Sequence, residues 1–159
     1  MPRFPLRPIL VLACTIGICA PSFAGAAEVN VPRTVGFAKG VNVTQAVRNQ
    51  CELETVVPTA IADASAKAEL VDGAGNLRLE ITGLHALGGG VFSGPKWMEV
   101  SGRLSRGGKH YTFRAKRFSA MDPFGGTCAI LGKIARAIGG DIATWLENPV
   151  GKAELGDAK

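Results

Sequence analysis

The sequence predicts an α+β fold: an antiparallel sheet of four or five strands, with two helices packed on one face and one disulfide. Three observations lead to this class. Apolar and polar residues alternate on both sides of Gly107-Gly108, apolar residues recur at helical spacing from Thr127 to Glu147, and two cysteines remain once an export leader is removed. The expected order of elements along the 159 residues is β-α-β-β-β-β-α.

The first 26 residues have the order of a secretory signal peptide. Arg3 and Arg7 precede an apolar run from Ile9 to Ala20, and small residues follow at Ala24–Ala26. The run is too short to span a bilayer, and the rest of the chain contains no longer one, so we expect no membrane span. The sequence therefore predicts a cleaved leader (1–26), a single domain (27–149) and a loose C-terminal tail (150–159), in a periplasmic or secreted protein.

Charge favours no particular class of partner. Removal of the leader leaves 16 basic against 13 acidic residues, a net charge of +3. This mild excess gives no reason to expect nucleic acid binding. Composition leaves the oligomeric state open.

The first two elements are expected to be a strand and a helix. The segment Glu28–Phe37 alternates valines in period two, but Pro32 withholds a backbone donor, so we expect an edge strand or two short pieces. A helix follows from Thr44, a residue suited to the N-cap, to about Ala66. Pro58 leaves two interpretations open: the helix kinks there, or it begins close before the proline.

Two hairpins are predicted next. In the first, extended runs flank Asp72–Asn76, a loop rich in turn-forming residues. In the second, Lys96–Ser105 and Lys109–Ser119 flank Gly107-Gly108, which is typical of a type I′ turn. The two-residue loop fixes the register of the second hairpin, and the predicted pairs are Leu104 with Tyr111, Gly102 with Phe113, Val100 with Ala115, Met98 with Arg117, Arg103 with Thr112, Ser101 with Arg114, Glu99 with Lys116 and Trp97 with Phe118.

The last helix is expected from Thr127 to Glu147. Its apolar residues fall within about a third of the helical circle, and Cys128 lies on the same arc. Gly132, Gly139 and Ala143 form a stripe of small residues beside that arc. Because glycine inside a helix costs roughly 1 kcal/mol relative to alanine, we expect another backbone to approach this stripe closely.

Cys51 and Cys128 are predicted to form a structural disulfide, because an exported protein with two cysteines usually pairs them. The alternative is a cysteine hydrolase in which Cys128, at a helix N-terminus, is the nucleophile and His110 is its base. The other familiar catalytic patterns are missing. The chain has no G-x-S-x-G and no CxxC motif, and two isolated histidines give a transition metal few ligands. We therefore expect no metal and no cofactor.

The strongest functional pattern is a basic strand face with aromatic residues on the second hairpin. The expected binding residues are Trp97, Arg103, Arg114, Lys116 and Phe118, together with Phe92 in the preceding glycine-rich loop.

The expectation that follows is a non-catalytic binding or accessory module of the cell envelope. Its partner would be an envelope protein, an anionic lipid or a cell-wall polymer. A further alternative is an inhibitor of an envelope or host hydrolase that uses the glycine-rich loop (88–94) as its plug.

Overall fold

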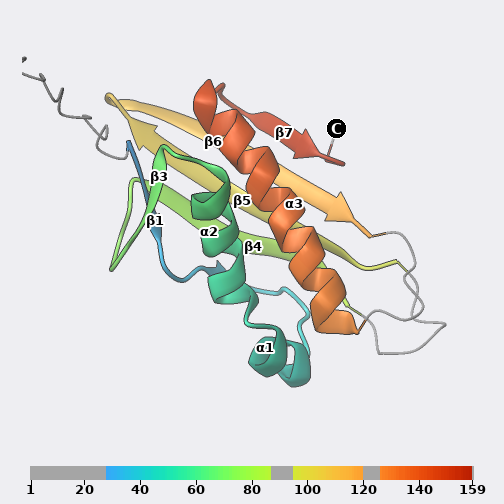
Figure 1. Cartoon of the computed structure of the whole chain (residues 1–159). Coiled ribbons are helices and arrows are strands. Elements are labelled where there is room, and N and C mark those ends of the chain that lie inside the picture. The colour runs from blue at the N-terminus through green and yellow to red at the C-terminus, as the bar shows by residue number, and fades with distance from the viewer. Residues whose placement is uncertain (1–27, 87–94, 120–125, 159) are drawn as a thin grey trace, which may run out of the picture.

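The computed structural model describes residues 28–86, 95–119 and 126–158. Within these ranges the chain forms a mixed five-stranded sheet with helices on one face, and a separate two-stranded sheet beside it (Figure 1). The predicted α+β class, with helices on one face and one disulfide, is confirmed. The elements in chain order are β1 (Val29–Pro32), β2 (Gly36–Phe37), α1 (Gln45–Cys51), α2 (Leu53–Ala64), β3 (Ala68–Val71), β4 (Leu77–His85), β5 (Trp97–Arg106), β6 (Lys109–Phe118), α3 (Thr127–Glu147) and β7 (Ala153–Gly156).

The hairpin of β5 and β6 forms as predicted, with all eight residue pairs in the expected register. Its turn residues Gly107 and Gly108 have φ values of 56° and 72°. A type I′ turn requires positive φ at both central positions, which glycine adopts without strain. This turn therefore sets which side chains of the hairpin face the helices.

The other predicted hairpin is wrong. β3 does not pair with β4; it pairs with β1 in parallel, and the two form the small sheet. The loop between β3 and β4 contacts β1 instead of turning one strand back on the other. The side chain of Asn76 accepts a hydrogen bond from the backbone N–H of Asn30 (2.7 Å). A Cβ at Gly75 would lie 1.9 Å from the carbonyl oxygen of Asn30, so only glycine fits there.

The first predicted helix is two helices. Thr44 caps α1 as expected, accepting a hydrogen bond from the backbone N–H of Val47. At Glu52 the backbone turns left-handed (φ 48°) and α2 begins at the next residue. Pro58 lies inside α2 and cannot donate to the carbonyl of Glu54; that carbonyl accepts from the N–H of Val35 instead (2.8 Å). The predicted edge strand around Pro32 is indeed two short strands, β1 and β2.

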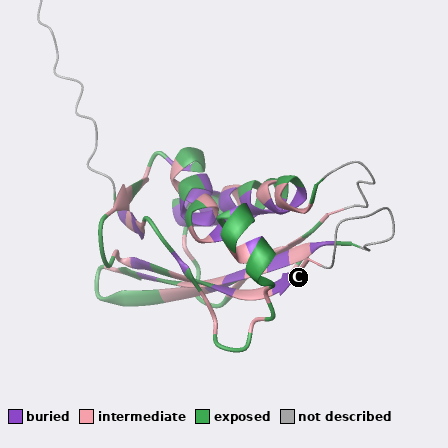
Figure 2. Ribbon diagram, turned by 90° about the horizontal axis from the view of Figure 1, so that it is seen from below, coloured by how far each residue is buried: buried purple, intermediate pink, exposed green. Residues whose placement is uncertain are grey.

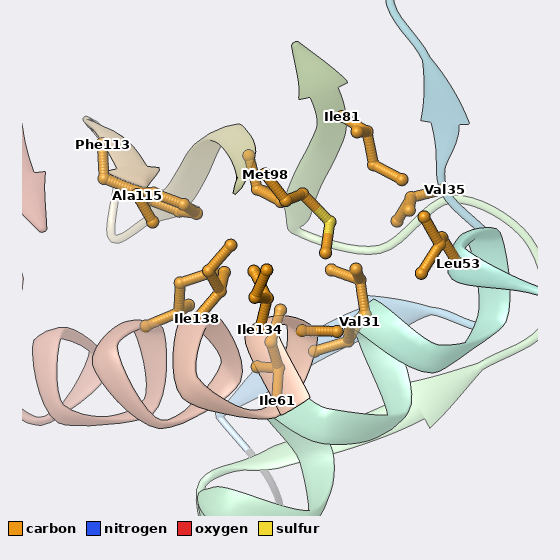
Figure 3. Packing of buried hydrophobic residues seen from close by; sticks show 14 of the residues in the cluster. Val31, Val35, Leu53, Ile61, Ile81, Met98, Phe113, Ala115, Ile134 and Ile138 are labelled. Atoms are coloured by element: carbon orange, nitrogen blue, oxygen red, sulfur yellow. The ribbon is translucent and has the colours of Figure 1, made fainter. Parts of the chain in front are cut away.

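Helix α3 closes the core. Its buried residues follow the predicted arc and pack with α2 against the apolar face of the sheet (Figure 3). The expected close approach occurs at Gly139, where a Cβ would lie 2.7 Å from backbone and side-chain atoms of Ala60 in α2. The ring of Phe113 in β6 lies against Gly102 of β5, where a Cβ would be 2.4 Å from it, and contacts the ring of Trp145 at 4.8 Å between centroids.

The C-terminal segment corrects a further expectation. Residues 150–159 were predicted to be loose, but β7 adds to the sheet edge in parallel with β6. Ala153 and Leu155 of β7 pack against the core, and polar contacts add to this packing. Arg117 donates to Asp141 of α3 (2.6 and 2.7 Å) and to Asp157 (3.2 Å), and Asp157 also accepts from the backbone N–H of Phe118. The sheet is therefore mixed and not purely antiparallel, since β2 and β7 both pair in parallel.

Candidate functional site

The face of the five-stranded sheet turned away from the helices is called the outer face here (Figure 2). On β4, β5 and β6 the side chains that alternate with the core residues point to it. None of them is buried, whereas the opposite face contributes Ile81, Met98 and Val100 to the core with no exposed surface. No helix in the described part of the chain therefore covers the outer face.

One end of the outer face holds a cluster of three rings and one cation, termed the Lys116 cluster: His85, Trp97, Lys116 and Phe118. The Lys116 ammonium lies 4.5 Å from the centroid of the Trp97 ring and 4.9 Å from that of Phe118. The rings of His85 and Trp97 are stacked with centroids 6.2 Å apart, and Phe118 is 47% exposed. Cation–π attraction of this kind holds an ammonium in place without neutralising its charge.

Backbone geometry places the Trp97 ring. An irregularity in the pairing of β4 with β5 between Ile81 and Gly83 shifts the register there and brings Gly83 opposite Glu99. A Cβ at Gly83 would lie 2.6 Å from the Trp97 ring, so the indole rests on bare backbone. The bulge and the glycine together let the ring lie against the backbone of β4, with Lys116 over the ring.

Arg114 is on the same face but is already paired. It donates to Glu154 of β7 (2.8 Å) and lies 3.9 Å from Glu99. The hydrogen bond to Glu154 raises the pKa of the Arg114 guanidinium, and the charges of both carboxylates add to the effect. Much of the charge of Arg114 is therefore balanced within the protein.

Arg103 lies at the other end of the outer face. It is exposed and is the register partner of Arg78 on β4. The two arginines border a shallow depression of about 470 Å³ that also includes Glu80, Ser101 and Thr112. Phe92 lies outside the described residues, as does the glycine-rich loop proposed for an inhibitor.

Two residues of the outer face were missed by sequence reasoning. They are His85 and Arg78, which are not among the expected binding residues. Both join the site through the pairing of β4 with β5, which no short turn specifies. The alternation of Leu77, Leu79 and Ile81 does place Arg78 on this face, but it does not identify the neighbouring strand.

Cys51 and Cys128 form the predicted disulfide, which joins the end of α1 to the start of α3. The structure does not bring Cys128 near His110. Trp145 contacts Phe113 and Asp141 binds Arg117, so α3 runs antiparallel to β6. Cys128 therefore lies beyond one end of β6, and His110, which is hydrogen-bonded to Ser105 at the turn, lies at the other.

Within the described ranges, no group of three or more histidine, cysteine or acidic residues is arranged to hold a metal ion. The same ranges contain no helix long and apolar enough to cross a bilayer.

Comparison with known proteins identifies no family. No protein-family model matches the chain, and no curated protein matches it. Among solved structures, the chain is similar to a PelC dodecamer from Paraburkholderia phytofirmans, with 12% sequence identity over 72% of this chain and 85% of that chain. The TM-score of 0.41 is too low for this likeness to support any inference about function.

Proposed function

We propose that this protein is an exported, non-catalytic binding module of the cell envelope that holds an anionic envelope component on its outer face. The observation that carries the proposal is the position of Lys116. Its ammonium lies over two rings, one of them exposed, on the sheet face that the described helices leave uncovered. A cation fixed in this way has N–H donors free for an anionic group, and the exposed ring offers apolar contact beside it.

The partners of Glu99 support this role for Lys116. Glu99 is its register partner on β5, yet Glu99 accepts a hydrogen bond from Thr82 (3.1 Å) and lies near Arg114. Lys116 itself forms no ion pair with a described residue. Its charge is therefore available to a ligand, unlike that of Arg114.

The positions of Cys128 and His110, the predicted nucleophile and base, support the non-catalytic part of the proposal. Cys128 is bonded to Cys51, and His110 lies at the far end of β6. Export is supported by the leader-like order of residues 1–26, and the disulfide fits an oxidising compartment.

The test is co-sedimentation of the purified protein with its own envelope fraction, with isolated cell wall and with vesicles that contain phosphatidylglycerol. We expect Lys116→Gln to weaken binding to the true partner about tenfold, the loss of one charge-assisted contact. Arg136→Gln is the matched control, because it removes one positive charge from an exposed position on α3. Raising the salt concentration should weaken wild-type binding as well.

Arg114 is unsuited to this experiment, because its substitution also removes the hydrogen bond to Glu154 of the edge strand β7. If a folded Lys116→Gln variant co-sediments as strongly as the wild type, the proposed site is wrong. The fraction that retains the protein would separate a lipid from a wall polymer.

A further inference from the structure

A second cationic site lies on the outer face at the end away from Lys116. Arg78 and Arg103 are directly opposed across β4 and β5, and both are exposed. Like charges in directly opposed positions of an antiparallel pair repel each other. Neither arginine forms an ion pair with any residue in the described part of the chain. The fold thus holds two guanidinium groups together without an internal anion between them.

The surroundings of this pair suit one anionic group. The depression between Arg78 and Arg103 is also lined by the hydroxyl-bearing residues Ser101 and Thr112. Guanidinium groups present forked N–H donors that match a carboxylate or phosphate bidentately, and hydroxyls add further donors. Glu80 borders the depression but forms an ion pair with neither arginine, so it restricts where an anion can lie without neutralising the site.

The balance of charge argues against a flat anionic membrane as the ligand. On β4, β5, β6 and β7 the outer face carries four basic and three acidic side chains, which are Arg78, Arg103, Arg114 and Lys116 against Glu80, Glu99 and Glu154. A uniformly charged surface would be attracted by the first set and repelled by the second almost equally. Separate anionic groups on one chain can lie at the basic positions and avoid the carboxylates.

The spacing of the two sites sets the length of such a ligand. Trp97, beside Lys116, and Arg103 are six residues apart on β5. At a rise of about 3.4 Å per residue, the two sites are roughly 20 Å apart. We propose that Arg78 and Arg103 form a subsite for one carboxylate or phosphate of a linear polyanionic polymer whose other anionic groups reach Lys116. This inference rests on the proposed function in placing the ligand on the outer face.

The experiment measures affinity against chain length at low salt by calorimetry. Two series serve as probes: oligogalacturonates, which carry carboxylates, and linear oligophosphates, both from the monomer to chains longer than about 20 Å. Wild-type affinity should rise steeply, by roughly 10²-fold, at the length that first spans both sites, because the second contact becomes intramolecular. The series that shows the rise identifies the anionic group.

The variants distinguish this inference from the proposed function. Arg103→Gln and Arg78→Gln should remove the steep rise and leave the weak binding of short oligomers at Lys116. Lys116→Gln should remove the rise too, and Arg136→Gln should keep it. An equal rise in Arg103→Gln and wild type, with circular dichroism showing a folded variant, would overturn the arginine subsite while the role of Lys116 stands. If the affinity of the wild type does not rise with chain length in either series, the proposal of a polymeric ligand is wrong.

Discussion

Basic side chains on the two faces of the sheet have different kinds of partner. On the helix-covered face, Arg117 of β6 binds Asp141 of α3 and Asp157 after β7. These hydrogen bonds to Asp141 raise the pKa of Arg117, against the opposing effect of burial. On the outer face, Lys116 is bordered by rings, and Arg103 has no acidic partner among the described residues. The charge of Arg117 on the covered face holds elements together, and the charges of Lys116 and Arg103 on the outer face stay available to a ligand.

Arg114 shows that position on a face is not sufficient to define a binding residue. It lies on the outer face two residues from Lys116, yet its guanidinium binds Glu154 and so links β6 to β7. The comparison therefore depends on the partners of each cation more than on the surface it occupies. Substitution of a cation that has an acidic partner should change stability, whereas substitution of Lys116 or Arg103 should change ligand binding.

The largest effect is expected from the disulfide on the covered side. The Cys51→Ala/Cys128→Ala double variant should lose about 2–4 kcal/mol of unfolding free energy, because a bond across 77 residues restricts the unfolded chain. Urea denaturation followed by circular dichroism measures this loss, and reduction of the wild type is the matched control. Ligand affinity of the folded fraction should not change. A loss below about 1 kcal/mol would mean that the packing of α1 and α3 alone holds the covered side.

The sequence predicted the parts of the fold that depend on residues close together in the chain, and not those that depend on contacts between distant residues. A two-residue glycine turn joins β5 and β6, so their register followed from residues next to each other in the chain. The loop Asp72–Asn76 has equally strong turn chemistry, but its Gly75 and Asn76 contact Asn30, about 45 residues earlier. Turn composition does not reveal whether a loop joins two strands that pair with each other or packs against a third strand.

The same reason explains the outcome for the C-terminal segment and for the site. β7 was missed because it has only four residues, two of them apolar, and because the strand that it pairs with, β6, lies about 40 residues earlier in the chain. The pairing of Trp97 with Phe118 across the hairpin was predicted locally and is confirmed. His85 was not expected beside Trp97, because the register of β4 shifts at the bulge before Gly83.

A middle-sized effect is expected from Arg117→Gln. This change removes the bidentate contact to the partly buried Asp141 and the contact to Asp157, so it should cost about 1.5–3 kcal/mol of unfolding free energy. Arg114→Gln is the matched control, since its exposed pair should contribute less than about 1 kcal/mol. Urea denaturation measures both, and amide exchange should quicken in β7 before the rest of the sheet. Equal losses in the two variants would remove the distinction between the faces.

The smallest effect on stability is expected from Arg103→Gln. Arg103 is exposed, donates to no described carboxylate, and faces the like charge of Arg78. Its replacement should leave the unfolding free energy within about 0.5 kcal/mol of wild type, or raise it slightly by relieving repulsion. Urea denaturation beside Arg117→Gln gives the comparison directly. A loss above about 1 kcal/mol would show that Arg103 supports the fold after all, and the outer face would then resemble the covered one. If Arg103 serves ligand binding and not stability, its substitution should leave stability unchanged and remove the binding of long polymers.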